Sequence, residues 1–254
     1  YFFRNQKKYF LLIFFLMIEN YVMKNSYSIN LVSPGFFNAY DFLKRTNKKN
    51  DLKITNFTNG ISTKFSNTIK NSTFPKSTNL EQNLKYRVVY AGNLGEGQDI
   101  YTLLNQISKK PEIIKKFVLN KISFEIYGAG SQLKDIESLI NNENSGLRDV
   151  VFYRGFVSRE NIEKVYTKAN CLLLQLSSYL PLSLVIPTKI FEYACTPYPI
   201  LFSASGYTKS FLNQIDSTFD YDYFKPETLL QSLIKAKTTE VKSSQRNLFL
   251  EKYI

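Results

Sequence analysis

From Tyr86 onward, short apolar segments alternate with segments of helical periodicity, and this alternation limits the fold more than any other feature of the sequence. Single helices between successive strands require crossover connections, which make the strands parallel and the crossovers right-handed. We therefore expect an α/β fold with a parallel sheet and helices on both faces. The predicted strands are 87–91, 122–127, 150–153, 172–174 and 199–202, and the predicted helices are 98–118 (broken near Pro111), 131–141, 158–168, 187–195 and, in the tail, 226–253.

The part of the sequence that precedes this alternation is organised differently. Residues 28–32 and 52–57 have the composition of short strands closed by turns, and a helix is expected over about 36–46. Residues 61–84 are rich in Ser, Thr, Asn and Lys and hold few aliphatic side chains. That composition cannot support a core, so we expect a linker here.

The strongest apolar run covers Tyr9 to Ile18 and stops at Glu19. A transmembrane helix needs about 20 apolar residues, so this run is too short to span a bilayer. Basic residues precede it, as in a signal peptide, but no small-residue cleavage site follows. We expect an apolar helix that is buried or lies against a membrane surface.

The chain holds 33 Lys and Arg and 21 Asp and Glu, which gives a net charge of +12 at pH 7. A surplus of this size is typical of proteins that bind nucleic acids or anionic membranes. Residues 1–85 hold 13 basic and 4 acidic side chains, so +9 of the charge lies there and the remainder of the chain is nearly balanced. No recognised nucleic-acid-binding motif is present, so a basic nucleic-acid-binding module is an alternative and not the favoured function.

The sequence contains no His, which removes the commonest metal ligand and the commonest general base. The two cysteines, Cys171 and Cys195, lie in apolar runs and are expected to be buried free thiols. We predict no metal site. Any chemistry must then depend on carboxylates, cations, hydroxyls and backbone dipoles.

Six of the ten glycines directly follow predicted strands, and in a parallel sheet ligands bind at that edge. Turn formation explains part of this clustering, and a phosphate-bearing ligand close to bare backbone explains the rest. The first glycine loop, 91–98, fits neither the dinucleotide fingerprint nor the P-loop. Arg154, in the third loop, is either a surface cation or an anion ligand. The six glycines are Gly92, Gly95, Gly97, Gly128, Gly130 and Gly155.

The segment 185–194 is the most informative one. Pro187 suits the first position of a helix, where the following backbone N–H groups and Lys189 would converge on an anion. Glu192 lies one turn further along, in an apolar setting where a carboxylate usually needs a partner. A ribose diol that donates two hydrogen bonds would be such a partner. A solvent-facing Glu on an amphipathic helix explains the segment about equally well.

Taken together, these loops and their flanking elements resemble the carboxyl-terminal domain of the retaining glycosyltransferases of family 4, in which two Rossmann-like domains face each other (the GT-B type). The resemblance covers about residues 87–215 and is greatest to the subgroup that builds cell-surface polysaccharides from nucleotide-activated amino or deoxy sugars. It rests on the segments YAGNLGEGQDI, FEIYGAGSQLKDIESLI, VVFYRGFVSRENIEKVYTKANCLLLQL and VIPTKIFEYACTPYPILFS.

The resemblance implies transfer of a sugar from a nucleotide-diphosphate donor to a lipid-linked or oligosaccharide acceptor, with the anomeric configuration retained. It implies that Lys189 and Thr188 address the phosphates, that Glu192 binds the ribose hydroxyls, and that Lys189 and helix dipoles stabilise the leaving group without a metal or other cofactor. The other implied substrate contacts are Asn93 and Gly95 at the diphosphate, Gly128 and Gly130 beside the nucleotide, and Arg154, Gly155, Phe156 and Val157 along the base.

The resemblance also implies a domain division. Residues 1–60 would be a remnant of the acceptor-side Rossmann-like domain, 61–85 the linker, 86–225 the donor-binding domain and 226–254 carboxyl-terminal helices. Most of the amino-terminal domain would then be missing, and we expect little or no activity from this chain alone. The first of the family's two glutamates is also absent, because its position is occupied by Leu184.

The partners that follow are a nucleotide-sugar donor, a saccharide acceptor and a membrane surface, with no nucleic acid. The expected location is the cytoplasm, at the inner face of the plasma membrane, where the basic first 85 residues would meet anionic lipid. A nucleotide-sugar epimerase of the same two-domain architecture is the alternative enzyme.

Overall fold

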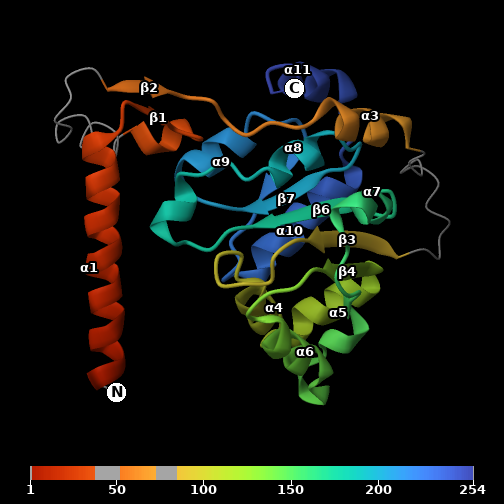
Figure 1. Cartoon of the computed structure of the whole chain (residues 1–254). Helices are drawn as coiled ribbons and strands as arrows, with labels where there is room; N and C mark the ends of the chain where they lie inside the picture. Colours follow the sequence, from red (N-terminus) through yellow and green to blue (C-terminus); the bar gives the residue numbers. More distant parts are fainter. Residues whose placement is uncertain (1, 38–51, 73–84, 254) are drawn as a thin grey trace. The chain divides into compact units, whose positions relative to one another are not determined.

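The computed structural model describes residues 2–37, 52–72 and 85–253, which belong to two compact units, Tyr1–Thr58 and Asn59–Ile254 (Figure 1). The second unit is built on six parallel strands in the order β5-β4-β3-β6-β7-β8. In this order the chain starts in the middle, runs out to one edge, returns to the middle and runs out to the other edge, which is the strand order of a Rossmann-like sheet. The strands are β3 (Tyr86–Ala91), β4 (Ile122–Tyr127), β5 (Val151–Tyr153), β6 (Cys171–Gln175), β7 (Ile200–Ser203) and β8 (Thr218–Asp220).

Helices cover both faces of this sheet, as the alternation in the sequence predicted (Figure 1). One face packs against α4 (Ile100–Ser108), α5 (Pro111–Leu119), α6 (Leu133–Asn141) and α10 (Pro226–Thr238). The other packs against α3 (Thr63–Asn71), α7 (Ile162–Tyr166), α8 (Lys189–Ala194), α9 (Gly206–Leu212) and α11 (Ser243–Leu250). Short 3-10 turns complete the connections: η2 (Glu143–Ser145), η3 (Leu147–Asp149), η4 (Arg159–Asn161) and η5 (Leu180–Ser183).

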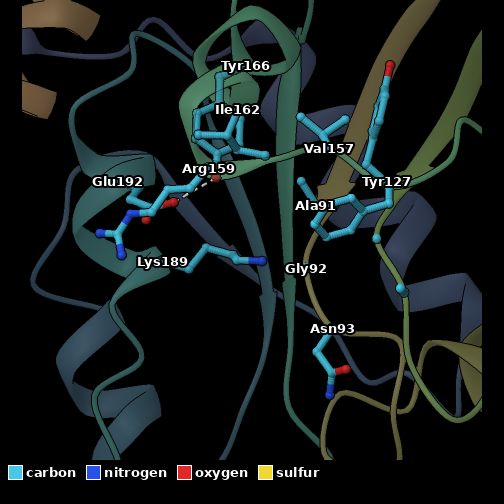
Figure 2. Close-up of a pocket in the computed structure, with 13 residues that line it drawn as sticks. Ala91, Gly92, Asn93, Tyr127, Val157, Arg159, Ile162, Tyr166, Lys189 and Glu192 are labelled. Atoms are coloured by element: carbon cyan, nitrogen blue, oxygen red, sulfur yellow. Dashed lines mark hydrogen bonds between the residues drawn. The ribbon is translucent and has the colours of Figure 1, made fainter.

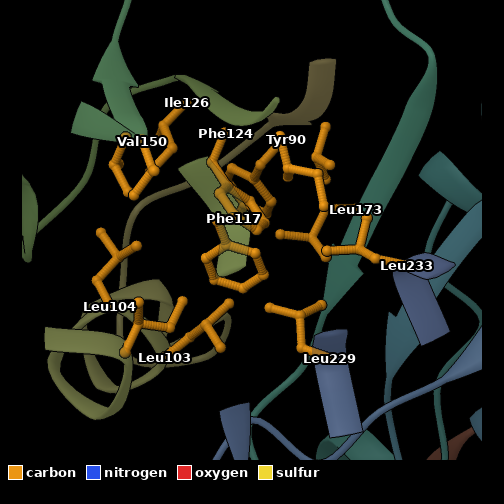
Figure 3. Close-up of a cluster of buried hydrophobic side chains, with 14 of the residues drawn as sticks. Tyr90, Leu103, Leu104, Phe117, Phe124, Ile126, Val150, Leu173, Leu229 and Leu233 are labelled. Atoms are coloured by element: carbon orange, nitrogen blue, oxygen red, sulfur yellow. The ribbon is translucent and has the colours of Figure 1, made fainter. Parts of the chain in front are cut away.

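Each face of the sheet has its own hydrophobic core, because successive side chains of a strand point to opposite faces. In β3, Val88 and Tyr90 belong to the first core, whereas Val89 and Ala91 belong to the second. Figure 3 shows the first core, in which the ring of Phe117 packs edge-on at 5.1 Å from that of Phe124. The strands are therefore buried on both sides, which explains their nearly continuous apolar sequences.

The beginning and the end of the second unit lie next to each other. The backbone N–H of Ile61 donates to the carbonyl of Tyr253 at 3.1 Å. A β-carbon on Gly60 would collide with the same carbonyl, so only glycine allows the two segments to come so close. The ring of Tyr253 lies 5.1 Å from that of Phe191 and extends the second core.

The first unit contains α1 (Phe2–Asn25), η1 (Pro34–Phe36) and two parallel strands, β1 (Ser28–Asn30) and β2 (Lys53–Thr55). The two strands confirm the predictions at 28–32 and 52–57. Most of the helix predicted over 36–46 lies outside the described residues.

The predicted apolar helix is present as α1. Most of its described apolar side chains, among them Phe10, Phe14, Met17 and Tyr21, are exposed. None of the helices in the described ranges combines the length and the apolar character that crossing a membrane requires.

Two α-helices and one strand were not predicted. The stretch predicted as a linker contains α3, and Ile69 of this helix is 0% exposed within the second core. Its apolar side chains, Phe65 and Ile69, are one helical turn apart and face the core, although the segment as a whole is polar. The strand β8 and the helix α9 were also missed, because both are short and neither has a strong apolar pattern.

Candidate functional site

The loops that follow β3 and β4 pack tightly against each other at the carboxyl edge of the sheet. The N–H of Gly92 donates to the carbonyl of Tyr127 at 2.9 Å, and the N–H of Leu94 donates to the carbonyl of Ala129 at 2.8 Å. Gly128 has a φ of +143°, and a β-carbon there would collide with the carbonyl oxygen of Gly92. A side chain at Gly128 would therefore force the two loops apart.

A pocket of about 440 Å³ opens beside these loops, next to α7 and α8 (Figure 2). It lies at the carboxyl ends of β3 and β4, beside the position where the strand order reverses between β3 and β6, which is where open α/β sheets bind ligands. Its lining residues are Ala91, Gly92, Asn93, Tyr127, Gly128, Ala129, Phe156, Val157, Arg159, Ile162, Tyr166, Lys189 and Glu192.

Lys189 extends from the first residue of α8 across the pocket to the first glycine loop (Figure 2). Its ammonium lies where a β-carbon on Gly92 would be, and 5.3 Å from the centre of the Tyr90 ring. Burial lowers the pKa of Lys189 to about 8, and the nearby charge of Glu192 opposes this shift. The ammonium makes no hydrogen bond or ion pair with any described residue. It is therefore a partly desolvated cation that is free to bind an anion.

Glu192 is held by a buried tyrosine from the neighbouring helix. The hydroxyl of Tyr166, a residue that is 0% exposed, donates to Oε2 of Glu192 at 2.8 Å (Figure 2). Burial raises the pKa of Tyr166 well above its usual value, with further contributions from Tyr193 and Glu192, so the hydroxyl keeps its proton. Oε1 of Glu192 accepts no hydrogen bond from the described residues. This oxygen remains able to accept one from a ligand hydroxyl.

The segment between β5 and α7 forms the opposite wall of the pocket. Gly155 has a φ of +86°, which suits glycine, and it precedes Phe156 and Val157 in the lining. The ring of Phe156 is 72% exposed at the rim, whereas Val157 is partly buried against the second core. This wall offers an apolar surface on which a flat group can lie.

The charge of the lining favours an anionic ligand. Lys189 and Arg159 contribute two positive charges and Glu192 one negative charge, which leaves a net charge of +1. No cluster of three or more potential metal ligands (His, Cys, Asp or Glu) occurs among the residues that the structure describes.

An arginine from the last helix fixes the far end of α8. Arg246 is 2% exposed, and its guanidinium donates to the carbonyls of Tyr193, Thr196 and Asp216 at 2.9 to 3.1 Å. The first two carbonyls lie at the carboxyl end of α8, where backbone oxygens have no partner within the helix. Arg246 therefore holds the helix that carries Lys189 and Glu192.

Six of the predicted site residues line the pocket: Asn93, Gly128, Phe156, Val157, Lys189 and Glu192. Gly95, Gly130, Gly155 and Thr188 do not line it. A β-carbon on Gly130 would collide with the backbone of Leu94, so this glycine serves the contact between the two loops.

Arg154 does not line the pocket either. It pairs with Glu125 at 3.4 Å and stacks on the ring of Phe152, 5.1 Å from its centre. Glu125 is buried and also accepts a hydrogen bond from the hydroxyl of Tyr127 at 2.9 Å. Arg154 thus balances a buried carboxylate, a partner that the local sequence does not reveal.

Seven lining residues were not predicted: Ala91, Gly92, Tyr127, Ala129, Arg159, Ile162 and Tyr166. Gly92 belongs to the glycine loop that the sequence singled out. Ile162 and Tyr166 are four residues apart and share one helix face, but nothing in the local pattern shows that this face meets α8.

Comparison with solved structures places this fold among glycosyltransferase structures. The chain is similar to HepE of Anabaena in complex with UDP (TM-score 0.64, 13% identity) and covers 62% of that protein's length. It is also similar to a variant of TarM of S. aureus in complex with fondaparinux, α-GlcNAc-glycerol and UDP (TM-score 0.62, 17% identity, 43% of that length). A third is the pneumococcal O-GlcNAc transferase GtfA in complex with UDP and GlcNAc (TM-score 0.60, 13% identity, 44% of that length).

Between 92% and 93% of this chain is covered in these three comparisons, so the chain spans about half the length of the structures that it matches. No protein-family model and no curated protein matches the sequence. At these identities the similarity shows the fold, a Rossmann-like unit of the kind found in these glycosyltransferase structures; the first unit contributes a separate two-stranded sheet.

Proposed function

We propose that the second unit binds the nucleoside diphosphate part of an activated sugar. The whole protein would transfer that sugar, with its anomeric configuration retained, to a hydroxyl of a saccharide acceptor. The observation that carries the proposal is the position of Lys189: its ammonium, which has no partner among the described residues, lies against bare glycine backbone in a pocket of the Rossmann-like sheet. Such a cation is suited to a diphosphate.

The diphosphate would lie between Lys189 and the first glycine loop. Gly92 has no side chain to keep a phosphate oxygen away from the ammonium or the backbone. The amide nitrogen of Asn93 donates to Oε1 of Gln98 at 2.9 Å, which holds this loop in shape. Arg159, an exposed residue that also lines the pocket, would add a second positive charge.

The nucleoside would extend from the diphosphate toward α7. Glu192 has one carboxylate oxygen held by Tyr166 and the other free, so the free oxygen can accept a hydrogen bond from a ribose hydroxyl. The base would then lie against the apolar wall at Phe156 and Val157. The pocket therefore offers a separate surface to each of the three parts of a nucleoside diphosphate.

In the transfer step, the bond between the anomeric carbon and the phosphate oxygen breaks, and the nucleoside diphosphate leaves with the electron pair. An acceptor hydroxyl forms the new bond to the anomeric carbon from the same side, and its proton passes to the departing phosphate oxygen. Negative charge grows on the leaving phosphate, and a cation that is already in position stabilises it without reorganisation. Lys189 would supply this stabilisation, which makes it the proposed catalytic cation.

Isothermal titration calorimetry with UDP, uridine and inorganic pyrophosphate tests the proposal. Lys189→Met is expected to weaken the binding of UDP and pyrophosphate by about tenfold or more and to leave the affinity for uridine unchanged. Glu192→Gln is expected to weaken the binding of UDP and uridine but not the binding of pyrophosphate. The matched control is Lys134→Met, an exposed lysine on α6. No UDP binding by the unaltered chain, or equal binding by Lys189→Met, would contradict the proposal.

Product analysis with a labelled nucleotide sugar distinguishes transfer from epimerisation in a longer chain that has both units complete. Transfer yields free nucleoside diphosphate and a new glycoside. An epimerase would return a nucleotide sugar of changed configuration and no glycoside.

We also propose that the first unit attaches to an anionic membrane surface. Two features support this proposal: the first unit, residues 1–58, holds 9 basic and 3 acidic residues, and apolar side chains of α1 are exposed. Cosedimentation with vesicles that contain phosphatidylserine, compared with vesicles of phosphatidylcholine alone, tests it. Equal binding to both vesicle types, or no binding to either, would contradict it.

A further inference from the structure

A second cavity lies at the same edge of the sheet, at the carboxyl ends of β6, β7 and β8. Its volume is about 410 Å³, which is within the range of small-molecule sites. It shares no lining residue with the pocket beside Lys189. The lining residues are Leu176, Ser178, Ser203, Ala204, Ser205, Lys209, Asp220, Tyr221, Asp222, Tyr223, Phe224 and Thr228.

The charges in this cavity are paired, in contrast to the free ammonium of Lys189. Lys209 forms an ion pair with Asp220, and Lys225 lies 3.4 Å from Asp222. Two carboxylates are thus balanced by two lysines, and the described lining residues include no unpaired cation. An anion gains little there, whereas an uncharged ligand can use both the donors and the acceptors.

Three serine hydroxyls add unused hydrogen-bonding capacity. Ser203 is buried, yet its hydroxyl has no hydrogen-bond partner within the described ranges. Ser205 precedes α9, but its side chain does not cap the helix. Ser178 uses its backbone N–H to donate to the hydroxyl of Tyr223, and its own hydroxyl is left without a described partner. These groups could donate to and accept from a ligand that carries several hydroxyls.

Aromatic rings form one wall of the cavity. The rings of Tyr223 and Phe224 lie 4.2 Å apart, and Phe224 is 50% exposed. Tyr221 is buried, and its hydroxyl donates to Gln175 at 2.9 Å, which fixes the wall to β6. The C–H face of a pyranose is apolar and weakly positive, so it packs well against the negative face of an aromatic ring.

The first glycine loop connects this cavity with the pocket beside Lys189. Asn93, at one end of the loop, lines the pocket beside Lys189. Further along, the carbonyl of Gly97 accepts a hydrogen bond from the N–H of Ser177 at 2.9 Å. The neighbours of Ser177 on either side, Leu176 and Ser178, line the second cavity. The two sites are therefore held together by one short loop at one edge of the sheet.

We propose that this second cavity binds an uncharged sugar unit, with a pyranose ring on the aromatic wall and its hydroxyls on the serines and carboxylates. The further identification of this unit as part of the saccharide acceptor rests on the proposed function. The binding of a sugar in this cavity stands on the cavity's own residues.

Ligand-observed saturation-transfer NMR on the 254-residue chain tests the inference, with methyl α-D-glucopyranoside and N-acetylglucosamine as probes and inorganic phosphate as the anion control. We expect dissociation constants in the millimolar range for the sugars. Phe224→Ala is expected to weaken sugar binding by about tenfold, and Ser203→Ala by about threefold. Leu119→Ala is the matched control, since it also removes an exposed apolar side chain but far from the cavity's lining.

The same variants separate this inference from the proposed function. Phe224→Ala should leave the affinity for UDP unchanged. Phe156→Ala should weaken UDP binding and leave the affinity for the sugars unchanged. If the chain binds the sugars through Phe224 but fails to bind UDP, the inference about the second cavity holds and the proposed function is contradicted. No sugar signal, a signal unchanged in Phe224→Ala and Ser203→Ala, or displacement of the sugar by phosphate would each overturn the inference.

Discussion

The ammonium of Lys189 fills the space that a β-carbon on Gly92 would occupy. The two residues are far apart in the sequence, and the parallel sheet brings them together at the edge where α8 meets the first glycine loop. The ammonium can occupy this place only because residue 92 has no side chain. The position of the cation can therefore be changed by a substitution at Gly92 as well as by one at Lys189.

Gly92→Ala is expected to displace the Lys189 ammonium and to weaken UDP binding by about tenfold. The folded chain should persist, because the new methyl group meets the far end of a flexible side chain and no positive φ is required at this position. Calorimetry with UDP measures the affinity, and thermal denaturation measures the stability. Gly97→Ala is the control, since its β-carbon would make only ordinary contact with Leu182. Equal losses in both variants would contradict the specific role of Gly92.

The affinity for UDP is expected to fall as the pH rises from 7 to 9. Burial lowers the pKa of Lys189 to about 8, so the free site loses its cation over this range. A bound diphosphate favours the protonated form, and its own phosphates are already ionised above about pH 6. Calorimetric titrations across this range check the prediction. Lys189→Arg, which keeps its charge, should bind UDP with an affinity that does not change with pH.

Tyr166→Phe is expected to weaken UDP binding by about twofold to tenfold, because Glu192 loses the hydroxyl that orients its carboxylate. Binding of inorganic pyrophosphate, which has no ribose, should not change. The control is Tyr86→Phe, which also removes a hydroxyl that donates to a partner, the carbonyl of Asn170. Equal loss of UDP and pyrophosphate binding in Tyr166→Phe would show that the tyrosine acts on the fold and not on Glu192.

Arg246→Gln is expected to lower the free energy of unfolding by about 3 kcal/mol. The guanidinium is buried, and the carbonyls of Thr196 and Asp216 would lose its hydrogen bonds in the variant, whereas the carbonyl of Tyr193 keeps the N–H and the hydroxyl of Thr196 as donors. Urea denaturation followed by circular dichroism measures the effect. Arg148→Gln, at an exposed position, should change the stability by less than about 1 kcal/mol.

Ile69→Ala is expected to destabilise the second unit by about 2 to 5 kcal/mol, since it empties a fully buried position. Urea denaturation again provides the measurement, and Ile234→Ala, at an exposed position of α10, is the control. A loss no larger than that of the control would mean that α3 is only a linker, as its composition suggested.

The sheet and most of its helices could be predicted because their sequences carry their own periodicity. Buried parallel strands such as β4 and β6 are nearly continuous apolar runs, and α5 and α6 have clear amphipathic patterns. The helix α3 could not be predicted in this way. Its few apolar side chains matter only because the rest of the second unit provides a surface for them, which local composition does not show.

The site was predictable where one segment carries the chemistry and unpredictable where two segments combine. Lys189 and Glu192 lie one turn apart on a short helix, so their proximity follows from helix geometry. Arg154 was left between two roles because its partner, Glu125, comes from another strand. Glu125 is in register with Phe152, and Arg154 follows on the same side two residues later, so only the pairing of β4 with β5 reveals the contact.

The hydrogen bond between Ile61 and Tyr253 brings the two termini of the second unit together. A domain whose ends are adjacent can be inserted into a loop of a host protein without forcing the ends of that loop apart. Its ends can also be joined and new termini made at another position of the chain. Insertion of residues 59–253 as a cassette, or circular permutation through a short joint between Tyr253 and Asn59, should therefore preserve the pocket at Lys189. The second unit can in this sense be moved between proteins as a self-contained part.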